Sequence, residues 1–263
     1  GKVYGLFSDL WTPTLRLGEV SDRCVSLQAR SDASKTQHRR PGMNQIVHRI
    51  WNTIPFPMNM PATPLATRTL GDFLDQLAAK TPTPGGGAVA SAVGALGSAL
   101  GEMVLAYSLG KKSLAEHEPK LREASAKLSR ARTVLLELAA EDEAAYGLVN
   151  ELSKLPEGDA RRADLPAATL AAARVPLSCM AACASVLRLL DTLPGITNKY
   201  LHSDLAIAAI LAEAATRSAA WNVRVNLPGI TDAQVRESLT HECEQLLTGS
   251  IETAGRVERA CRG

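Results

Sequence analysis

The sequence predicts an all-α protein in which several helices form one bundle-like domain with a long central helix. Two observations support this fold class. Hydrophobic residues make up 46% of the chain but aromatic residues only 4%. Much of the apolar share is alanine and leucine, which favour helices, whereas a β-sandwich needs more Val, Ile, Tyr and Phe. From Thr69 onwards, apolar residues also recur at helical spacing in one stretch after another.

The first sixty residues differ from the rest. They hold half of the aromatic residues, show no sustained period, and include the polar stretch SDASKTQHRRPG and the proline-interrupted IPFPMNMPATP. We therefore expect residues 1–60 to be a disordered or loosely attached arm and residues 61–263 to form the helical domain. The basic run HRR within the arm could be a targeting or nucleic-acid-binding tail, although a solvated extension is favoured. Because Met58 and Met60 stand just before the periodic sequence, we hypothesise that the functional protein begins there.

Charge and cysteine usage exclude some function classes. Up to Met60 there are 8 Lys and Arg against 4 Asp and Glu, and beyond it 21 against 23, so the helical body is nearly neutral and does not call for nucleic acid. Cys179 and Cys183 could ligate a metal, but no second pair or nearby histidine completes a site. We expect free thiols, no metal and a cytoplasmic protein, because the five cysteines form no disulfide framework.

The first two predicted helices flank an unusual glycine turn. TLGDFLDQLAAK begins at Thr69, which suits an N-cap with Asp72 as its N3 partner. TPTPGGGAVAS follows at 81–91. Three glycines in a row indicate either a tight bend against another helix or a ligand lying against bare N–H groups at a helix N-terminus.

Residues 88–110 are predicted to form the next helix, which is apolar nearly all round. The stretch is long enough to span a bilayer, but it contains Glu102 and lacks flanking aromatic residues, so a buried central helix is favoured over a membrane span. Small residues recur every four positions and would let another helix approach closely: Ala90, Gly94 and Ser98 in one row, Gly97 and Gly101 in another.

A long helix is predicted from about Pro119 to Lys154. One heptad row contains Leu121, Leu128, Leu135 and Val149, and a companion row contains Ala124, Ala131, Leu138, Ala145 and Leu152. The first row has no apolar residue at position 142, where the sequence has Asp142 instead. A carboxylate in an apolar seam must be paired or have a raised pKa. The spacing alone does not decide between a catalytic acid and a buried aspartate that bonds a neighbouring helix end.

Three further helices complete the domain. The first spans about 166–190, with Pro176 expected to kink or split it. The second begins at Ser203 as N-cap with Asp204 in its first turn, and the third opens at Thr231.

Taken in order, these segments resemble the formiminotetrahydrofolate cyclodeaminase and methenyltetrahydrofolate cyclohydrolase family. The resemblance covers about residues 68–250. It rests on PGGGAVAS, SLGKK, AEDEAAYGLV with LSKLPEG, AARVPL, TNKYLHSDLAIAA and WNVRVNLPGITD. It implies an all-helical homodimer with folate bound among helices, no metal and no cofactor besides the tetrahydrofolate substrate, and no membrane. One departure is Ala88, where the family usually has serine after the glycines.

The resemblance also implies the chemistry. Cyclodeamination joins N10 of tetrahydrofolate to the formimino carbon on N5 and releases ammonia, whereas cyclohydrolysis adds water to the methenyl bridge and opens the ring. Both reactions need a base and an acid. On the matched positions, the catalytic candidates are Asp142 and Asp204. The substrate-binding candidates are Gly85, Gly86, Gly87, Asn198, Ser203, Asn222, Asn226, Lys111 and Lys112, the two lysines for the carboxylates of a polyglutamylated folate.

Each candidate also has a plainer interpretation. Asp204 and Ser203 can form an ordinary N-cap pair, the two asparagines near 222–226 can bond backbone, and lysines after a helix end can simply favour its dipole. The sequence does not separate hydrolysis from deamination, although a chain with no formiminotransferase domain leans towards hydrolysis. The alternative function is a helical dimer that binds folate or a partner without turnover.

Overall fold

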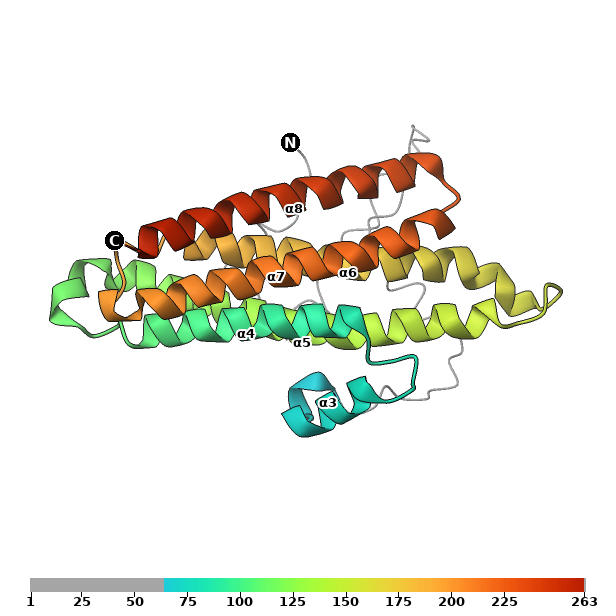
Figure 1. Cartoon of the computed structure of the whole chain (residues 1–263), viewed down its shortest axis with the longest axis horizontal. Coiled ribbons are helices and arrows are strands. Elements are labelled where there is room, and N and C mark those ends of the chain that lie inside the picture. The colour runs from blue at the N-terminus through green and yellow to red at the C-terminus, as the bar shows by residue number, and fades with distance from the viewer. Residues whose placement is uncertain (1–63, 263) are drawn as a thin grey trace, which may run out of the picture. The chain divides into compact units, whose positions relative to one another are not determined.

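The computed structural model describes residues 64–262, which form six α-helices and contain no strand (Figure 1). The all-α prediction is confirmed, whereas the predicted arm lies outside these residues. Short 3-10 turns join several of the helices. The helices are α3 Leu70–Ala78, α4 Gly86–Ala106, α5 Glu118–Ser153, α6 Leu165–Leu190, α7 His202–Asn226 and α8 Ala233–Cys261.

Helix α4 is the central helix of the bundle. It packs against α5, α6 and α7, while α6 also packs on α5 and α7, and α8 covers α6 and α7. In Figure 1 the long helices run alongside one another and the short α3 lies beside α4 and α5. The chain enters α4 at the same end of the bundle at which it leaves α7, so these two neighbours run antiparallel.

The small residues of α4 permit close packing, as predicted. A Cβ on Gly97 would lie 2.9 Å from the backbone oxygen of Ala208 in α7, and a Cβ on Gly94 would lie 2.7 Å from Sγ of Cys183 in α6. Since real Cβ atoms essentially never approach other heavy atoms below 3.0 Å, these positions need glycine for the helices to pack at this separation. Two neighbours on different sides of α4 thus depend on its small residues.

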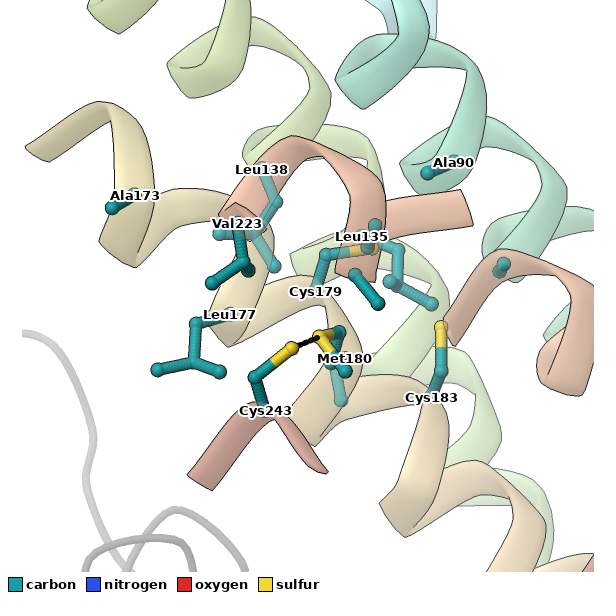
Figure 2. Close-up of a cluster of buried hydrophobic side chains, with 14 of the residues drawn as sticks. Ala90, Leu135, Leu138, Ala173, Leu177, Cys179, Met180, Cys183, Val223 and Cys243 are labelled. Atoms are coloured by element: carbon teal, nitrogen blue, oxygen red, sulfur yellow. Dashed lines mark hydrogen bonds between the residues drawn. The ribbon is translucent and has the colours of Figure 1, made fainter. Parts of the chain in front are cut away.

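The heptad rows of α5 form a core seam. Leu121, Leu128 and Leu135 are completely buried, and all five residues of the companion row are buried, whereas Val149 is only half-buried. Figure 2 shows Leu135 and Leu138 of this seam meeting α6 and α7 in the main apolar cluster. In this cluster Cys179, Cys183 and Cys243 are buried free thiols, and the Cys243 Sγ donates to Sδ of Met180 at 3.8 Å.

Two helix starts and one helix interior differ from the sequence expectation. Ser203 is not an N-cap, because a 3-10 turn at 199–201 runs directly into α7 and places Ser203 inside its first turn. Helix α8 is capped by Asp232, whose Oδ1 accepts from the N–H groups of the next turn, rather than by Thr231. Helix α6 continues through Pro176 without splitting. The predicted Thr69 cap is confirmed, since its Oγ1 accepts from the Asp72 N–H at 3.1 Å.

Two helices among the described residues meet the length and hydropathy of a membrane span, namely α4 and α6 with the turn before it. The most apolar windows of these two helices are 56% and 61% buried within the bundle. Core helices of globular proteins show the same properties, so the packing favours the buried central helix expected from Glu102 over a span.

Candidate functional site

The glycine turn and Asp142 lie in direct contact. The turn opens α4 with Gly85 as N-cap, and no side chain of the turn itself caps the helix. A Cβ on Gly87 would lie 2.0 Å from Oδ1 of Asp142, so the carboxylate occupies the space that any other residue at 87 would need. The Ala88 N–H hydrogen-bonds the Asp142 carboxylate. Asp142 therefore reaches from α5 to the N-terminus of α4, where N–H groups and the helix dipole favour negative charge.

The surroundings of Asp142 shift its acidity towards neutral pH. Burial raises the pKa of Asp142 to about 6, and the charge of Glu143 adds to the rise, while the Ala88 N–H opposes it. Both interpretations that the sequence left open are compatible with this position, and the catalytic role stays a prediction. The carboxyl bonds a neighbouring helix end, and it has the acidity that acid–base catalysis requires near pH 7.

Asn222 completes this group from α7. A Cβ on Gly86 would lie 3.4 Å from Oδ1 of Asn222, which places the amide beside the exposed start of α4. Its Nδ2 donates to the Ser218 carbonyl one turn earlier. We call Gly85, Gly86, Gly87, Asp142 and Asn222 the glycine-turn cluster, which joins three helices at the N-terminal end of α4.

Asn226 has a structural role in this arrangement. Its Nδ2 donates to the backbone oxygen of Ala172 at 3.1 Å and to that of Asn222 at 2.8 Å. It thereby ties the end of α7 to α6 and holds the turn that carries Asn222. Of the two interpretations given for this residue, its contacts match backbone bonding.

The remaining candidates lie at the opposite end of the bundle. The backbone N–H of Asn198 donates to Ser108 Oγ at 2.9 Å, which fixes the loop before α7 against the end of α4, and Asn198 Oδ1 caps the following 3-10 turn. Ser203 and Asp204 lie in the first turn of α7, and the exposed Lys111 and Lys112 follow α4. We call Asn198, Ser203, Asp204, Lys111 and Lys112 the distal cluster.

The two clusters are far apart within one chain. They stand near opposite ends of the 21-residue α4, and 18 positions of α7 separate Asp204 from Asn222. At 1.5 Å per residue, that separation is about 27 Å. The two clusters therefore do not form one compact site within a single chain, and the catalytic and binding roles given to their members stay predictions.

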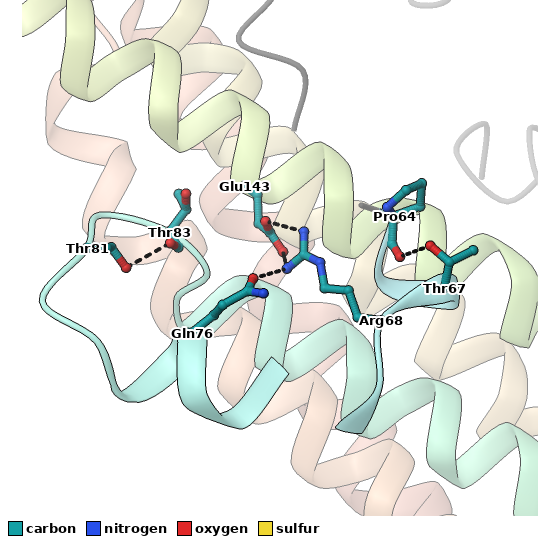
Figure 3. Close-up of polar contacts among 7 residues, drawn as sticks. All are labelled: Pro64, Thr67, Arg68, Gln76, Thr81, Thr83 and Glu143. Carbon is teal, nitrogen blue, oxygen red and sulfur yellow. Dashed lines mark hydrogen bonds and ion pairs between the residues drawn. The ribbon is translucent and has the colours of Figure 1, made fainter. Parts of the chain in front are cut away.

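Sequence reasoning missed two charged residues beside Asp142. Glu143, the next residue of α5, is buried and forms an ion pair with Arg68, which precedes α3 (Figure 3). The two partners are 75 positions apart in the chain. The local sequence EDE at 141–143 is typical of a solvent-exposed acidic helix turn, so it does not indicate a buried ion pair. No periodic signal in the sequence distinguishes Glu143 from its exposed neighbour Glu141.

Ala88, the departure from the family pattern, faces the protein interior. Its side chain is completely buried and packs with Phe73 of α3 and Ala139 of α5. Its backbone N–H, by contrast, serves Asp142. A hydroxyl at position 88 would therefore lie among apolar side chains, and its absence leaves the glycine-turn cluster intact.

A groove of about 1140 Å³ lies elsewhere, between the end of α7 and the start of α8, lined among others by Arg224, Arg236 and His241. It includes no member of either cluster. His202, the histidine nearest the distal cluster in sequence, hydrogen-bonds the Pro194 carbonyl through Nε2. Neither histidine is thus placed beside Asp142.

Comparison with known proteins gives consistent results. The sequence model of the family described as formiminotransferase-cyclodeaminase matches residues 69–245. A methenyltetrahydrofolate cyclohydrolase of Methylorubrum extorquens is 38% identical over 184 residues, which are 68% of this chain and 88% of that protein. A formimidoyltransferase-cyclodeaminase of Gallus gallus is 31% identical over 72% of this chain but only 35% of its own length.

A solved structure extends the similarity to the fold. The crystal structure of a formiminotetrahydrofolate cyclodeaminase from Thermotoga maritima superposes with a TM-score of 0.71 at 33% sequence identity. The match covers 75% of this chain and 98% of that one. The helical body described above is thus nearly the whole of that protein.

Proposed function

Since this chain belongs to the formiminotransferase-cyclodeaminase family and is a one-carbon folate enzyme acting on the C–N bond of 5,10-methenyltetrahydrofolate, we propose that it is a methenyltetrahydrofolate cyclohydrolase. The relative at 38% identity supports hydrolysis, because it carries that name and is matched over 88% of its length. The observation that carries the mechanism is the contact between Asp142 and the glycine turn.

Asp142 can serve as both base and acid in this reaction. With a pKa of about 6, both protonation states are populated near neutral pH. The ionised carboxylate takes a proton from the water that attacks the methenyl carbon. The protonated carboxyl then donates to the nitrogen that leaves as the ring opens. The remaining hydroxyl proton of the adduct passes to solvent as the formyl C=O forms, so the reaction releases one proton overall. The exposed backbone at Gly85 and Gly86 and the amide of Asn222 bind the folate beside it.

Cyclodeamination is the second candidate, favoured by the similarity to the Thermotoga maritima enzyme. In that reaction the same carboxyl takes the proton of N10 as this nitrogen attacks the formimino carbon, and it donates a proton to the departing ammonia. Both reactions are acid–base chemistry. We propose that the tetrahydrofolate derivative is the only small molecule required and that the protein acts in the reducing cytoplasm.

We propose further that the enzyme is a homodimer in which each site combines the glycine-turn cluster of one copy with the distal cluster of the other. An exposed apolar face supports this arrangement: Leu96 lies on it from α4, and Ile207, Ile210 and Trp221 from α7. Leu96 stands ten residues from Gly86 and ten from Ala106. A two-fold axis passing near it and perpendicular to α4 would bring opposite ends of two copies together.

In such a dimer, the two lysines of the distal cluster would bind the folate tail. Lys111 and Lys112 carry positive charge at the end of the bundle that faces the partner's glycine turn. They would bind the glutamate carboxylates, with tighter binding for polyglutamylated folate. Asp204 and Asn198 would then approach the pterin or the reacting bridge from the second copy.

Absorbance at the methenyltetrahydrofolate band distinguishes the two activities. The purified chain is mixed with methenyltetrahydrofolate or with formiminotetrahydrofolate, and the release of ammonia is followed in parallel. Decay of the band with the first substrate and no ammonia from the second establishes a cyclohydrolase. Appearance of the band together with ammonia establishes a cyclodeaminase. No change with either substrate, in protein that still binds folate, would replace both proposals with the non-catalytic binding protein.

A further inference from the structure

The buried ion pair next to Asp142 belongs to neither cluster. Arg68 holds both carboxylate oxygens of Glu143, through Nη1 to Oε1 at 3.1 Å and Nη2 to Oε2 at 3.0 Å. Nη1 also donates to Oε1 of Gln76 in α3 at 3.2 Å (Figure 3). The two side chains are only 2% and 7% exposed. Taking both charges out of water is costly, so the pair depends on this two-pronged geometry.

The pair attaches the segment before α3 to α5, at the residue next to Asp142. Phe73 of α3 packs against Ala88 and Ala139, which are the first turn of α4 and the turn of α5 just before Asp142. Arg68 bonds both Glu143 of α5 and Gln76 of α3, and so connects these two helices. Asp142, the preceding residue on the helix, faces Gly87 instead. Two adjacent carboxylates thus turn to different partners.

We propose that Arg68 is a positioning residue for the reaction, because it balances the charge of Glu143 and so sets the pH at which Asp142 exchanges its proton. This inference rests on the proposed role of Asp142. The charge of Glu143 raises the pKa of Asp142, and the guanidinium of Arg68 lies 3.0 Å from the Glu143 carboxylate, where it offsets part of that charge. Removing either partner must change the acidity of Asp142, in opposite directions.

Among residues 64–262, few other groups act on Asp142. From α6, the Cys179 thiol lies close; a hydrogen bond with Cys183 lowers the pKa of Cys179, and the charge of Asp142 acts in the opposite direction. Helix α4 contributes the Ala88 N–H, and α7 contributes the uncharged amide of Asn222 beside Gly86. The charges of Glu143 and Arg68 are therefore the main ones through which a substitution can alter the acidity of Asp142.

The test is a charge cycle at the two positions. Glu143→Gln removes the negative charge and leaves Arg68, so the pH midpoint of Asp142 should fall by about one unit. Arg68→Met leaves Glu143 unbalanced, so the midpoint should rise by about one unit. The double variant should have a midpoint between those of the two single variants. Arg68→Lys keeps the positive charge but loses the two-pronged hydrogen bonding, so its midpoint should stay close to that of the wild type.

A second ion pair on the same helix provides the matched control. Arg132 of α5 bonds Glu102 of α4 at 2.7 Å, ten positions away from Asp142. Arg132→Met also removes one positive charge, from a pair that is more exposed to solvent, and it should leave the midpoint unchanged. If Arg68→Met fails to fold, Glu143→Gln and the double variant still carry the test.

Two readouts separate this inference from the proposed function. One is the acid limb of the kcat/KM profile for methenyltetrahydrofolate, and the other is a carboxyl-carbon NMR titration in which Asp142→Asn assigns the Asp142 signal. Opposite shifts in the NMR titration support the inference even if the protein turns over neither folate, in which case only the proposed function fails. Activity that depends on Asp142, with midpoints as unmoved as in Arg132→Met, overturns the inference and leaves the function standing.

Discussion

The carboxyl group of Asp142 has lost much of its hydration and lies beside the charge of Glu143, and these two effects raise its pKa to about 6. The folded protein therefore binds this proton more tightly than the unfolded chain does. The stabilising contribution is complete below the ordinary aspartate pKa and is lost as pH rises through about 6. Above that pH the ionised carboxylate lowers the free energy of unfolding relative to the protonated form.

Asp142→Asn should therefore stabilise the protein at high pH. At pH 8 we expect the free energy of unfolding to increase by about 2 kcal/mol, because the uncharged amide is cheaper to bury. At pH 4 the two proteins should unfold alike. Urea denaturation at both pH values measures the difference. Equal stability at pH 8 would show that the Ala88 N–H fully compensates the burial of the charge.

Gly87 is the residue on which the position of Asp142 depends most directly. In Gly87→Ala the new methyl group would lie 2.0 Å from Oδ1, so the carboxylate must move away from the helix end. Displacement of a catalytic group by about 1 Å can cost about 100-fold in rate, and we expect a loss of that size in kcat/KM. Gly71→Ala, whose methyl meets only Thr69 Oγ1 at 3.8 Å, is the control for an added side chain near the site. Equal activity in the two variants would contradict the prediction.

At the scale of the helices, the small residues of α4 determine how closely α7 packs. Gly97→Ala places a methyl 2.9 Å from the Ala208 carbonyl, which is backbone and cannot rotate away. We expect it to destabilise the fold by about 1–3 kcal/mol. Gly147→Ala in α5, where nothing lies within 4 Å, should instead stabilise by about 0.5–1 kcal/mol, because alanine favours a helix. Thermal unfolding of the two variants measures both; a stabilised Gly97→Ala would show that α7 moves aside freely.

The helices were largely predictable because their signals are local. The heptad rows of α5 and the four-residue repeat in α4 each predict a buried helix face. Thr69 together with Asp72 predicts where a helix starts. The boundary errors also have local causes. At Ser203, a 3-10 turn extends the helix upstream of the residue with the best capping side chain, and Asp232 follows the weaker cap Thr231 directly.

The candidate site was predictable only in part. A carboxylate interrupting an apolar row identified Asp142, and three glycines identified the turn, but no spacing indicated that these two features touch. The bond from Arg68 to Glu143 joins distant segments and leaves no periodic trace. The sequence likewise does not predict that Asn198 and Asp204 lie far from Asp142. Their position follows from the antiparallel packing of α4 and α7, which no local pattern indicates.

At the scale of the whole molecule, the shared-site dimer predicts complementation between inactive variants. Asp142→Asn and Asp204→Asn should each be inactive as homodimers. After unfolding and refolding together in equal amounts, half of the dimers are mixed, and each mixed dimer has one intact site. We expect about a quarter of the wild-type activity per total protein. No recovery, in mixtures shown to contain mixed dimers, would place each complete site within one chain.

The central claim is that the carboxyl group held at the glycine turn carries out the proton transfers. The most direct measurement is kcat/KM for methenyltetrahydrofolate across pH in the wild type and Asp142→Asn. The expected wild-type profile rises through a midpoint near 6, where the ionised form of Asp142 appears, and the variant should lose at least about 100-fold with no such limb. A variant that keeps wild-type activity and the same pH profile would contradict the claim.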